Sequence, residues 1–112
     1  LCATSKGNKK IYHYLKSKKI QFITEKRFES CKYKIPLPFD FYIPDKKILI
    51  EYDGEQHFIP IDFWGGKKGL NERITKDKIK DLWAKKNRMK LIRIKYNENI
   101  TSKVNELLKN YG

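Results

Sequence analysis

Three acidic residues interrupt the most apolar part of this chain. Asp40 stands inside the string PFDFYI, and Glu51 and Asp53 close the string ILIEYD. Carboxylate oxygens are the ligands that Mg²⁺ prefers, and this ion keeps water molecules that a substrate phosphate can replace. Such an ion polarises a phosphate and promotes attack by water. The three acids are therefore candidate ligands for Mg²⁺, or for Mn²⁺ in its place.

The rest of the chain carries a large excess of positive charge. Its 112 residues include 26 Lys and Arg against 13 Asp and Glu, which gives a net charge of +13. Such an excess favours a polyanionic partner, most often a nucleic acid, although a composition rich in solvated lysines gives the same count. Charge alone separates neither DNA from RNA nor binding from cleavage.

The acids fall in two expected strands that are joined by the turn PDKK. Side chains alternate between the two faces of a strand. Pairing Ile43 with Ile48 places six apolar or aromatic residues on one face: Phe39, Phe41, Ile43, Ile48, Ile50 and Tyr52. The same register puts Asp40 directly opposite Glu51. Two carboxylates ~5 Å apart repel by roughly 3 kcal/mol at an effective dielectric of ~20. A shared cation would remove that cost; the alternative is a solvated face whose acids pair with lysines.

Further side chains are candidates for the same site. His57 lies four residues after Asp53, where the second strand should end, and an imidazole serves as a general base or acid near neutral pH. Asp77 and Lys80 lie one helical turn apart and share a face. Lys80 would reach a phosphate while Asp77 orients His57 or a water molecule. A loop histidine without function and a surface ion pair are the simpler explanations.

A basic, glycine-rich segment, FWGGKKG at 63–69, leads into the helix that carries these two residues. Its Lys67 and Lys68, together with Arg73 and Lys80, are the expected contacts to a nucleic-acid backbone. The sequence contains no P-loop, zinc-finger spacing, nucleophile elbow or dinucleotide fingerprint.

Hydrophobic periodicity predicts the elements that must position these residues. We expect helices over 8–19, 70–87 and 101–108, strands over 20–28, 39–43, 48–53 and 89–96, and a loop over 29–38. The apolar side of the second helix should consist of Ile74, Ile79, Leu82 and Trp83. This order predicts one α/β domain, 1–112, around a mixed sheet.

Composition also limits the setting of the protein. No apolar run approaches the ~20 residues of a membrane span, so no membrane contact is expected. Cys2 and Cys31 form no metal-ligand pair, which favours reduced thiols and a cytoplasmic location. Because the chain begins with Leu1 rather than Met, we interpret it as a fragment of a longer chain.

The element order and the string FDFYIPDKKILIEYDGEQH resemble the PD-(D/E)XK nuclease superfamily. The resembling branch contains the very short patch repair endonucleases and the phage homing endonucleases, and is summarised by an EDxHD pattern. The resemblance covers about residues 5–96. It implies a restriction-endonuclease-like αβββαβ core with a mixed central sheet flanked by helices, followed here by a C-terminal helix.

Carried over by position, the resemblance makes Asp40 the central metal ligand. Glu51 and Asp53 occupy the strand where the superfamily has an acid, any residue and then a lysine. Because Asp53 stands in place of that lysine, the positive charge must come from elsewhere, and Lys80 is the candidate.

The resemblance also assigns roles outside these strands. His57 would match the histidine of the pattern and transfer protons, and Asp77 would match its final acid. Relatives begin the first helix with a Gly-Glu pair, whereas this chain has Gly7 and Asn8. An asparagine can coordinate a metal through its carbonyl oxygen but cannot act as a base, so the site either tolerates Asn8 or has reduced activity.

The function predicted in this way is a Mg²⁺-dependent endodeoxyribonuclease domain that acts on duplex DNA in a bacterial, phage-infected or virus-infected cell. A DNA-binding module is expected upstream in the full-length chain, and a homodimer is left open. Phage relatives carry a cysteine-rich segment upstream, so the resemblance makes Cys2 the remnant of a removed metal-binding module. Two alternatives remain: a nuclease fold that binds DNA but has lost catalysis, and an RNA-directed nuclease with the same chemistry.

Overall fold

The computed structural model describes residues 6–54 and 66–111, which form an α/β fold with four strands. In chain order the elements are α1 (Lys6–Ser17), β1 (Ile23–Tyr33), β2 (Ile35–Ile43), the short 3-10 helix η1 (Pro44–Lys46), β3 (Ile48–Asp53), α2 (Gly66–Lys86), β4 (Lys90–Lys95) and α3 (Ile100–Tyr111). This order confirms the predicted α/β class and the C-terminal helix. Within these residues, no helix is both long and apolar enough to cross a membrane.

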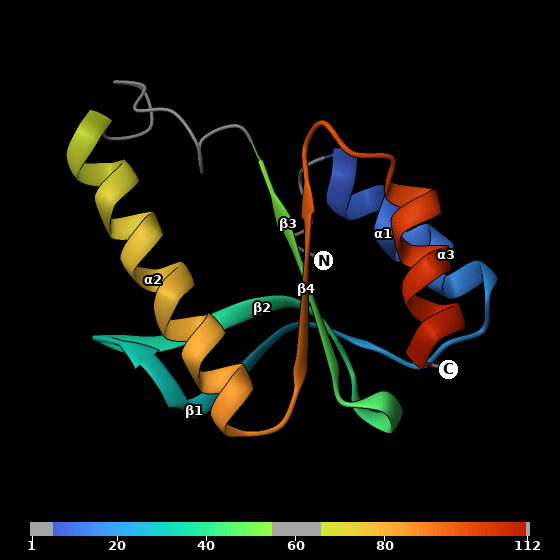
Figure 1. The fold of residues 1–112 in the computed structure, drawn as a ribbon, viewed down its shortest axis with the longest axis horizontal. Coiled ribbons are helices and arrows are strands. Elements are labelled where there is room, and N and C mark those ends of the chain that lie inside the picture. Colours follow the sequence, from blue (N-terminus) through green and yellow to red (C-terminus); the bar gives the residue numbers. More distant parts are fainter. Residues whose placement is uncertain (1–5, 55–65, 112) are drawn as a thin grey trace.

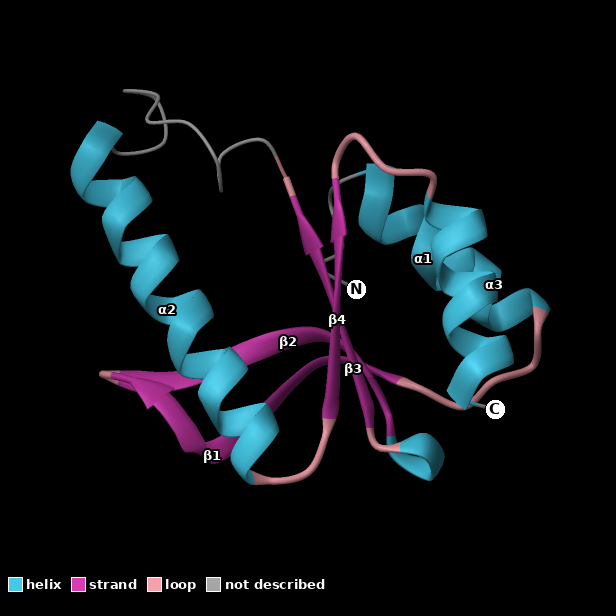
Figure 2. Ribbon diagram, viewed as in Figure 1, coloured by secondary structure: helices cyan, strands magenta, loops and turns pink. Residues whose placement is uncertain are grey.

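The strands form one mixed sheet in the order β1-β2-β3-β4. The first two pairs are antiparallel, and β3 runs parallel to β4. A parallel neighbour requires a crossover connection, which contains α2 here. Figures 1 and 2 show α2 on one side of β3 and β4, with α1 and α3 together on the other side. The prediction of a mixed sheet flanked by helices is therefore confirmed.

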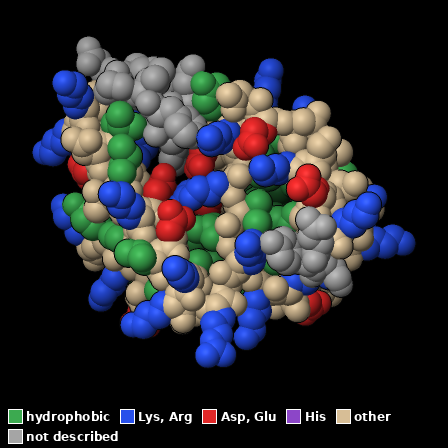
Figure 3. Space-filling model, viewed as in Figure 1, with side chains coloured by type: hydrophobic (Ala, Val, Ile, Leu, Met, Phe, Trp, Pro, Cys, Tyr) green, Lys and Arg blue, Asp and Glu red, His purple; other side chains and the backbone are tan. Residues whose placement is uncertain are grey.

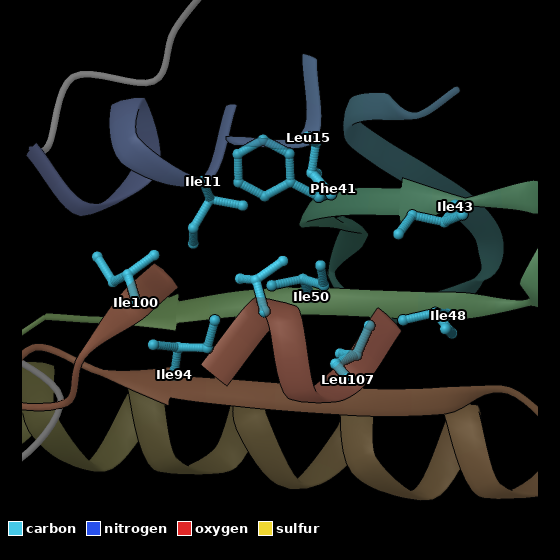
Figure 4. Packing of buried hydrophobic residues seen from close by; sticks show 10 residues of the cluster. Ile11, Leu15, Phe41, Ile43, Ile48, Ile50, Ile94, Ile100 and Leu107 are labelled. Carbon is cyan, nitrogen blue, oxygen red and sulfur yellow. The ribbon is translucent and has the colours of Figure 1, made fainter. Parts of the chain in front are cut away.

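The larger core lies between the sheet and the helices α1 and α3. Ile11 and Leu15 are four residues apart on α1, so both face the sheet, and both are fully buried. Figure 4 shows them beside the Phe41 ring of β2 and over Ile50 of β3, with residues of α3 and β4 completing the cluster. Its buried members are Ile11, Leu15, Phe41, Ile43, Ile48, Ile50, Ile94, Ile100, Val104 and Leu107.

A smaller cluster lies beneath α2 and corrects one prediction. Phe39, expected on the same face as Phe41, instead packs with Leu49 and Ala84. Its ring lies 5.9 Å from that of Trp83 on α2, centroid to centroid. The ladder between β2 and β3 has its last pair at Phe41 and Ile50. Beyond it β2 continues with β1 beneath α2, as Figure 1 shows, and therefore presents Phe39 to α2.

The expected loop over 29–38 is wrong, because β1 and β2 form a hairpin through this segment. The turn falls at Lys34, whose φ is 71°. Pro36 and Pro38 pair with Lys32 and Arg27 of β1. Proline lacks an N–H and is tolerated on an edge strand, and this half of β2 has no ladder pair with β3. The two prolines are thus compatible with a strand.

The predicted apolar side of α2 is also partly wrong. Leu82 and Ile74 are 69% and 41% exposed, whereas Lys80 and Ala84 are the buried residues of the helix. The reason is that α2 covers the sheet face that carries the acids, so its inner face includes a lysine. Ile79 and Trp83 do pack against the smaller cluster, as predicted.

Candidate functional site

Asp40 and Glu51 lie at the fork where β2 and β3 separate. The predicted pairing of Ile43 with Ile48 is confirmed. One step past the last ladder pair, the Asp40 N–H donates to Oε2 of Glu51 at 2.7 Å. The Tyr52 N–H donates to Oδ2 of Asp40, also at 2.7 Å. Side-chain carboxylates thus accept backbone hydrogen bonds between the two strands, and this fixes both acids at the fork.

The electrostatics of the fork are unfavourable for two carboxylates. The pKa of Asp40 is raised from 3.8 to about 7, first by burial and then by the negative charge of Glu51. The hydrogen bond from Tyr52 and the charge of Lys80 act in the opposite direction. Near neutral pH, Asp40 therefore exists as a mixture of the protonated and ionised forms.

Lys80 brings a positive charge from α2 to the same fork. Its Nζ lies 2.6 Å from Oε1 of Glu51, and the two side chains are only 10% and 5% exposed. The ammonium group also lies 5.2 Å from the ring centroid of Phe39. A buried ion pair is held in place because moving either partner away would leave an uncompensated buried charge.

Arg93 on β4 forms a second charge cluster beside this pair. Its Nη1 lies 3.3 Å from Oδ1 of Asp53 and 3.5 Å from Oδ1 of Asp77. Its Nη2 lies 3.0 Å from Oδ1 of Asp81 and donates to the backbone carbonyl of Asp77 at 3.1 Å. Burial alone lowers the pKa of Arg93, but the charges of Asp77 and Asp53 raise it overall. Arg93 of β4 therefore contacts both β3 and α2.

Sequence reasoning missed Arg93, although a signal was present. Arg93 alternates with Ile92 and Ile94, whose side chains pack toward the larger core. In the parallel register Arg93 is the partner of Glu51. A charged residue inside the apolar string LIRI would thus be placed on the acidic face by alternation alone.

The remaining predicted residues fall in different places. Asp53 is buried and Asp77 half-buried, and both contact Arg93. His57 lies outside the described residues, as do positions 63–65 of the basic segment. Lys67 and Lys68 are exposed in the first turn of α2 rather than in the loop that was predicted.

The start of α1 contacts the strand that carries Glu51. A Cβ atom at Gly7 would lie 2.2 Å from Cζ of Tyr52, so the tyrosine ring occupies the space that a side chain would need. Asn8 follows Gly7 and is half-buried. The glycine thus allows the first turn of α1 to approach β3 between Glu51 and Asp53.

Acidic side chains gather in this region. Figure 3 shows acidic side chains between α2 and the strands β3 and β4, surrounded by basic ones. Among the described side chains, no group of three or more His, Cys, Asp or Glu residues is arranged to hold a metal ion. The assignment of Asp40, Glu51 and Asp53 as a ligand set stays a prediction.

The donor chemistry of the fork nevertheless fits a hard divalent cation. Asp40 and Glu51 supply carboxylate oxygens, and the raised pKa of Asp40 reflects burial and repulsion that a cation would offset. Lys80 is the competing positive charge at Glu51. Comparison of the chain with family models, curated proteins and solved structures gives no match.

Proposed function

We propose that this chain is a Mg²⁺-dependent endonuclease domain of restriction-endonuclease-like fold that hydrolyses phosphodiester bonds in duplex DNA. The observation that carries the proposal is the fork, where the Asp40 N–H donates to Glu51, the Tyr52 N–H donates to Asp40, and Lys80 of α2 donates to Glu51. The helix-strand order matches the order that the resemblance to the PD-(D/E)XK superfamily implies, which supports the fold assignment.

In this proposal Asp40 and Glu51 hold the cation, and Asp53 is a further ligand. Bound Mg²⁺ would polarise the phosphate and favour the attack of water. Residues of the protein position the carboxylates and transfer the proton. Arg93 holds Asp53 against β4, and the backbone N–H groups of Asp40 and Tyr52 orient the carboxylates. His57 is the proposed proton-transfer group.

The charge distribution supports a nucleic-acid substrate. The net charge of +13 attracts a polyanion over long range. Glu51 and Asp53 are buried, so their negative charges are not exposed to an approaching polyanion. Lys67, Lys68 and Arg73 belong to α2, the helix whose Lys80 contacts Glu51 at the fork. They are the proposed contacts to the DNA backbone, together with Lys80.

Plasmid nicking in the presence of Mg²⁺ tests this function. We expect Asp40→Ala to lower the nicking rate by at least ~100-fold, because charge-stabilising groups contribute about that much or more to catalysis. Asp45→Ala is the matched control, since Asp45 is an exposed acid at the turn of the same hairpin. Equal nicking by the intact chain and Asp40→Ala would show that the site is assigned wrongly.

A second candidate is a DNA-binding module of the same fold that has lost catalysis. The observation that favours it is Asn8, which stands on α1 at the position where the resembling nucleases have a glutamate. Tight, salt-sensitive binding of duplex DNA without cleavage in Mg²⁺ or Mn²⁺ would support this candidate. Recovery of nicking by Asn8→Glu would then locate the defect. A parallel assay with single-stranded RNA tests the RNA-directed alternative.

A further inference from the structure

A groove of about 220 Å³ lies between α2 and β2, next to the fork. It is lined by Leu37, Pro38, Arg73, Lys76, Asp77 and Lys80. The three basic residues lie at helical positions i, i+3 and i+7, so they share one face of α2. The acid in the lining, Asp77, is already in contact with Arg93. The groove therefore presents a row of cations beside an apolar wall.

Lys80 belongs to both the groove and the fork. Its side chain lines the groove, while its Nζ is paired with Glu51 at 2.6 Å. The pair is almost fully buried, with side-chain exposures of 10% and 5%. Removing Lys80 from Glu51 would leave two uncompensated buried charges, which is strongly unfavourable. Lys80 can change position only if each charge gains another partner.

We propose that this groove binds a backbone phosphate of duplex DNA, and that Lys80 then exchanges Glu51 for that phosphate. The inference rests on the proposed function, in which a divalent cation takes the place of Lys80 at Glu51. The phosphate compensates Lys80 and the cation compensates Glu51, so the binding of either favours the binding of the other. This coupling is reciprocal by thermodynamic necessity.

The chemistry of the lining fits a phosphodiester. A guanidinium such as that of Arg73 offers paired donors that match phosphate oxygens, and lysine ammonium groups bind phosphate as point charges. Leu37 and Pro38 provide an apolar wall against which a deoxyribose can pack. A phosphate that contacts Arg73 and Lys76 would also attract Lys80, which lies one turn further along the helix.

The first test measures duplex binding without any metal. We expect Glu51→Gln to tighten the binding of a labelled 16-base-pair duplex in EDTA, followed by fluorescence anisotropy, because it releases Lys80 toward the groove. Glu72→Gln, which removes a negative charge elsewhere on α2, is the matched control. The increase in duplex affinity for Glu51→Gln should exceed the increase for the control by at least ~5-fold. Equal increases in affinity would show that Lys80 does not exchange Glu51 for a phosphate.

The second test measures the binding of Mn²⁺ alone by titration calorimetry. Lys80→Met should bind Mn²⁺ at least ~5-fold more tightly than the intact chain, because the competing ammonium is gone. Lys78→Met is the control, since Lys78 is an exposed lysine of α2 that does not line the groove. If Lys80→Met binds Mn²⁺ no more tightly than Lys78→Met, Lys80 does not compete at Glu51.

A third variant covers the case in which the buried substitutions do not fold. Lys76 is half-buried and lines the groove, so Lys76→Gln should weaken duplex binding more than Lys78→Gln does. Equal losses would contradict the groove as a phosphate site. The plasmid assay tests the proposed nuclease function separately. If the groove variants behave as expected but no plasmid is nicked, the groove is supported as a DNA site and the nuclease function is not.

Discussion

Lys80 on α2 and Glu51 on β3 are 29 residues apart in the sequence, and a 2.6 Å ion pair joins their side chains in the protein interior. The other carboxylate oxygen of Glu51 accepts the N–H of Asp40. Glu51 therefore connects the helix to both arms of the strand fork. This connection places the ammonium group of Lys80 and the carboxylates of Glu51 and Asp40 close together.

The first prediction concerns the strength of this ion pair. Lys80→Met and Glu51→Gln should each lower the free energy of unfolding by about 3–5 kcal/mol, because each leaves a buried group without its partner. The double variant should lose less than the sum of the two. Urea unfolding measures all three. Lys78→Met, an exposed control, should change stability by no more than ~0.5 kcal/mol. Additive losses would mean that the two groups do not interact.

The second prediction concerns the pH dependence of stability. The pKa of Asp40 is about 7 in the folded protein against 3.8 ordinarily, so between these values the folded state holds a proton that the unfolded state has lost. The stability that Asp40 contributes is therefore fully present below about pH 4 and is lost as the pH rises through about 7. Asp40→Asn should remove this dependence.

Urea unfolding of both proteins between pH 5 and 8 measures the effect. The stability of the intact chain, relative to that of Asp40→Asn, should fall with increasing pH and become constant above about pH 8. A difference that does not change with pH would contradict the raised pKa. Asp45→Asn, at the exposed turn, should follow the intact chain.

The third prediction concerns Arg93, which contacts three acids. Arg93→Met should lower the free energy of unfolding by roughly 3 kcal/mol, because Asp53 and Asp77 would then lie together without a cation. Arg93→Lys should restore only part of this loss, since an ammonium cannot reproduce the forked contacts of a guanidinium. Lys85→Met, at an exposed position of α2, is the control. A full rescue by lysine would show that charge alone matters.

The register of the acids could be predicted because it depends on local features. Strand alternation and a turn of four residues fix the pairing of Ile43 with Ile48, and one step past the last ladder pair Asp40 contacts Glu51. The burial of Lys80 could not be predicted in this way. It depends on which face of α2 meets the sheet, and the apolar residues Ile74 and Leu82 indicated a different face.

The course of β2 was also beyond local reasoning. Pro36 and Pro38 normally indicate a loop, and only the separation of β2 from β3 makes them acceptable in a strand. The same separation sends Phe39 to the α2 side of the sheet. Both features follow from the fork, which is a tertiary feature that no short segment of sequence specifies.

The fourth prediction concerns the contact between α1 and β3. Glycine is unfavourable in a helix, so alanine would ordinarily stabilise α1 by up to about 1 kcal/mol. At Gly7 the sign should reverse, because the new Cβ would lie 2.2 Å from Cζ of Tyr52. We expect Gly7→Ala to lower stability by about 1–3 kcal/mol in urea unfolding. A stabilised variant would show that the ring moves aside at little cost.

The most direct test of the central claim is a crystal soaked in Mn²⁺ at about pH 8, where Asp40 is ionised. Anomalous scattering locates the ion without reference to any substrate. The account predicts an anomalous peak that contacts both the Asp40 and the Glu51 carboxylates, and no such peak in a crystal of Asp40→Ala. A fully soaked crystal with no peak at the fork, or with an ion bound only at other acids, would contradict it.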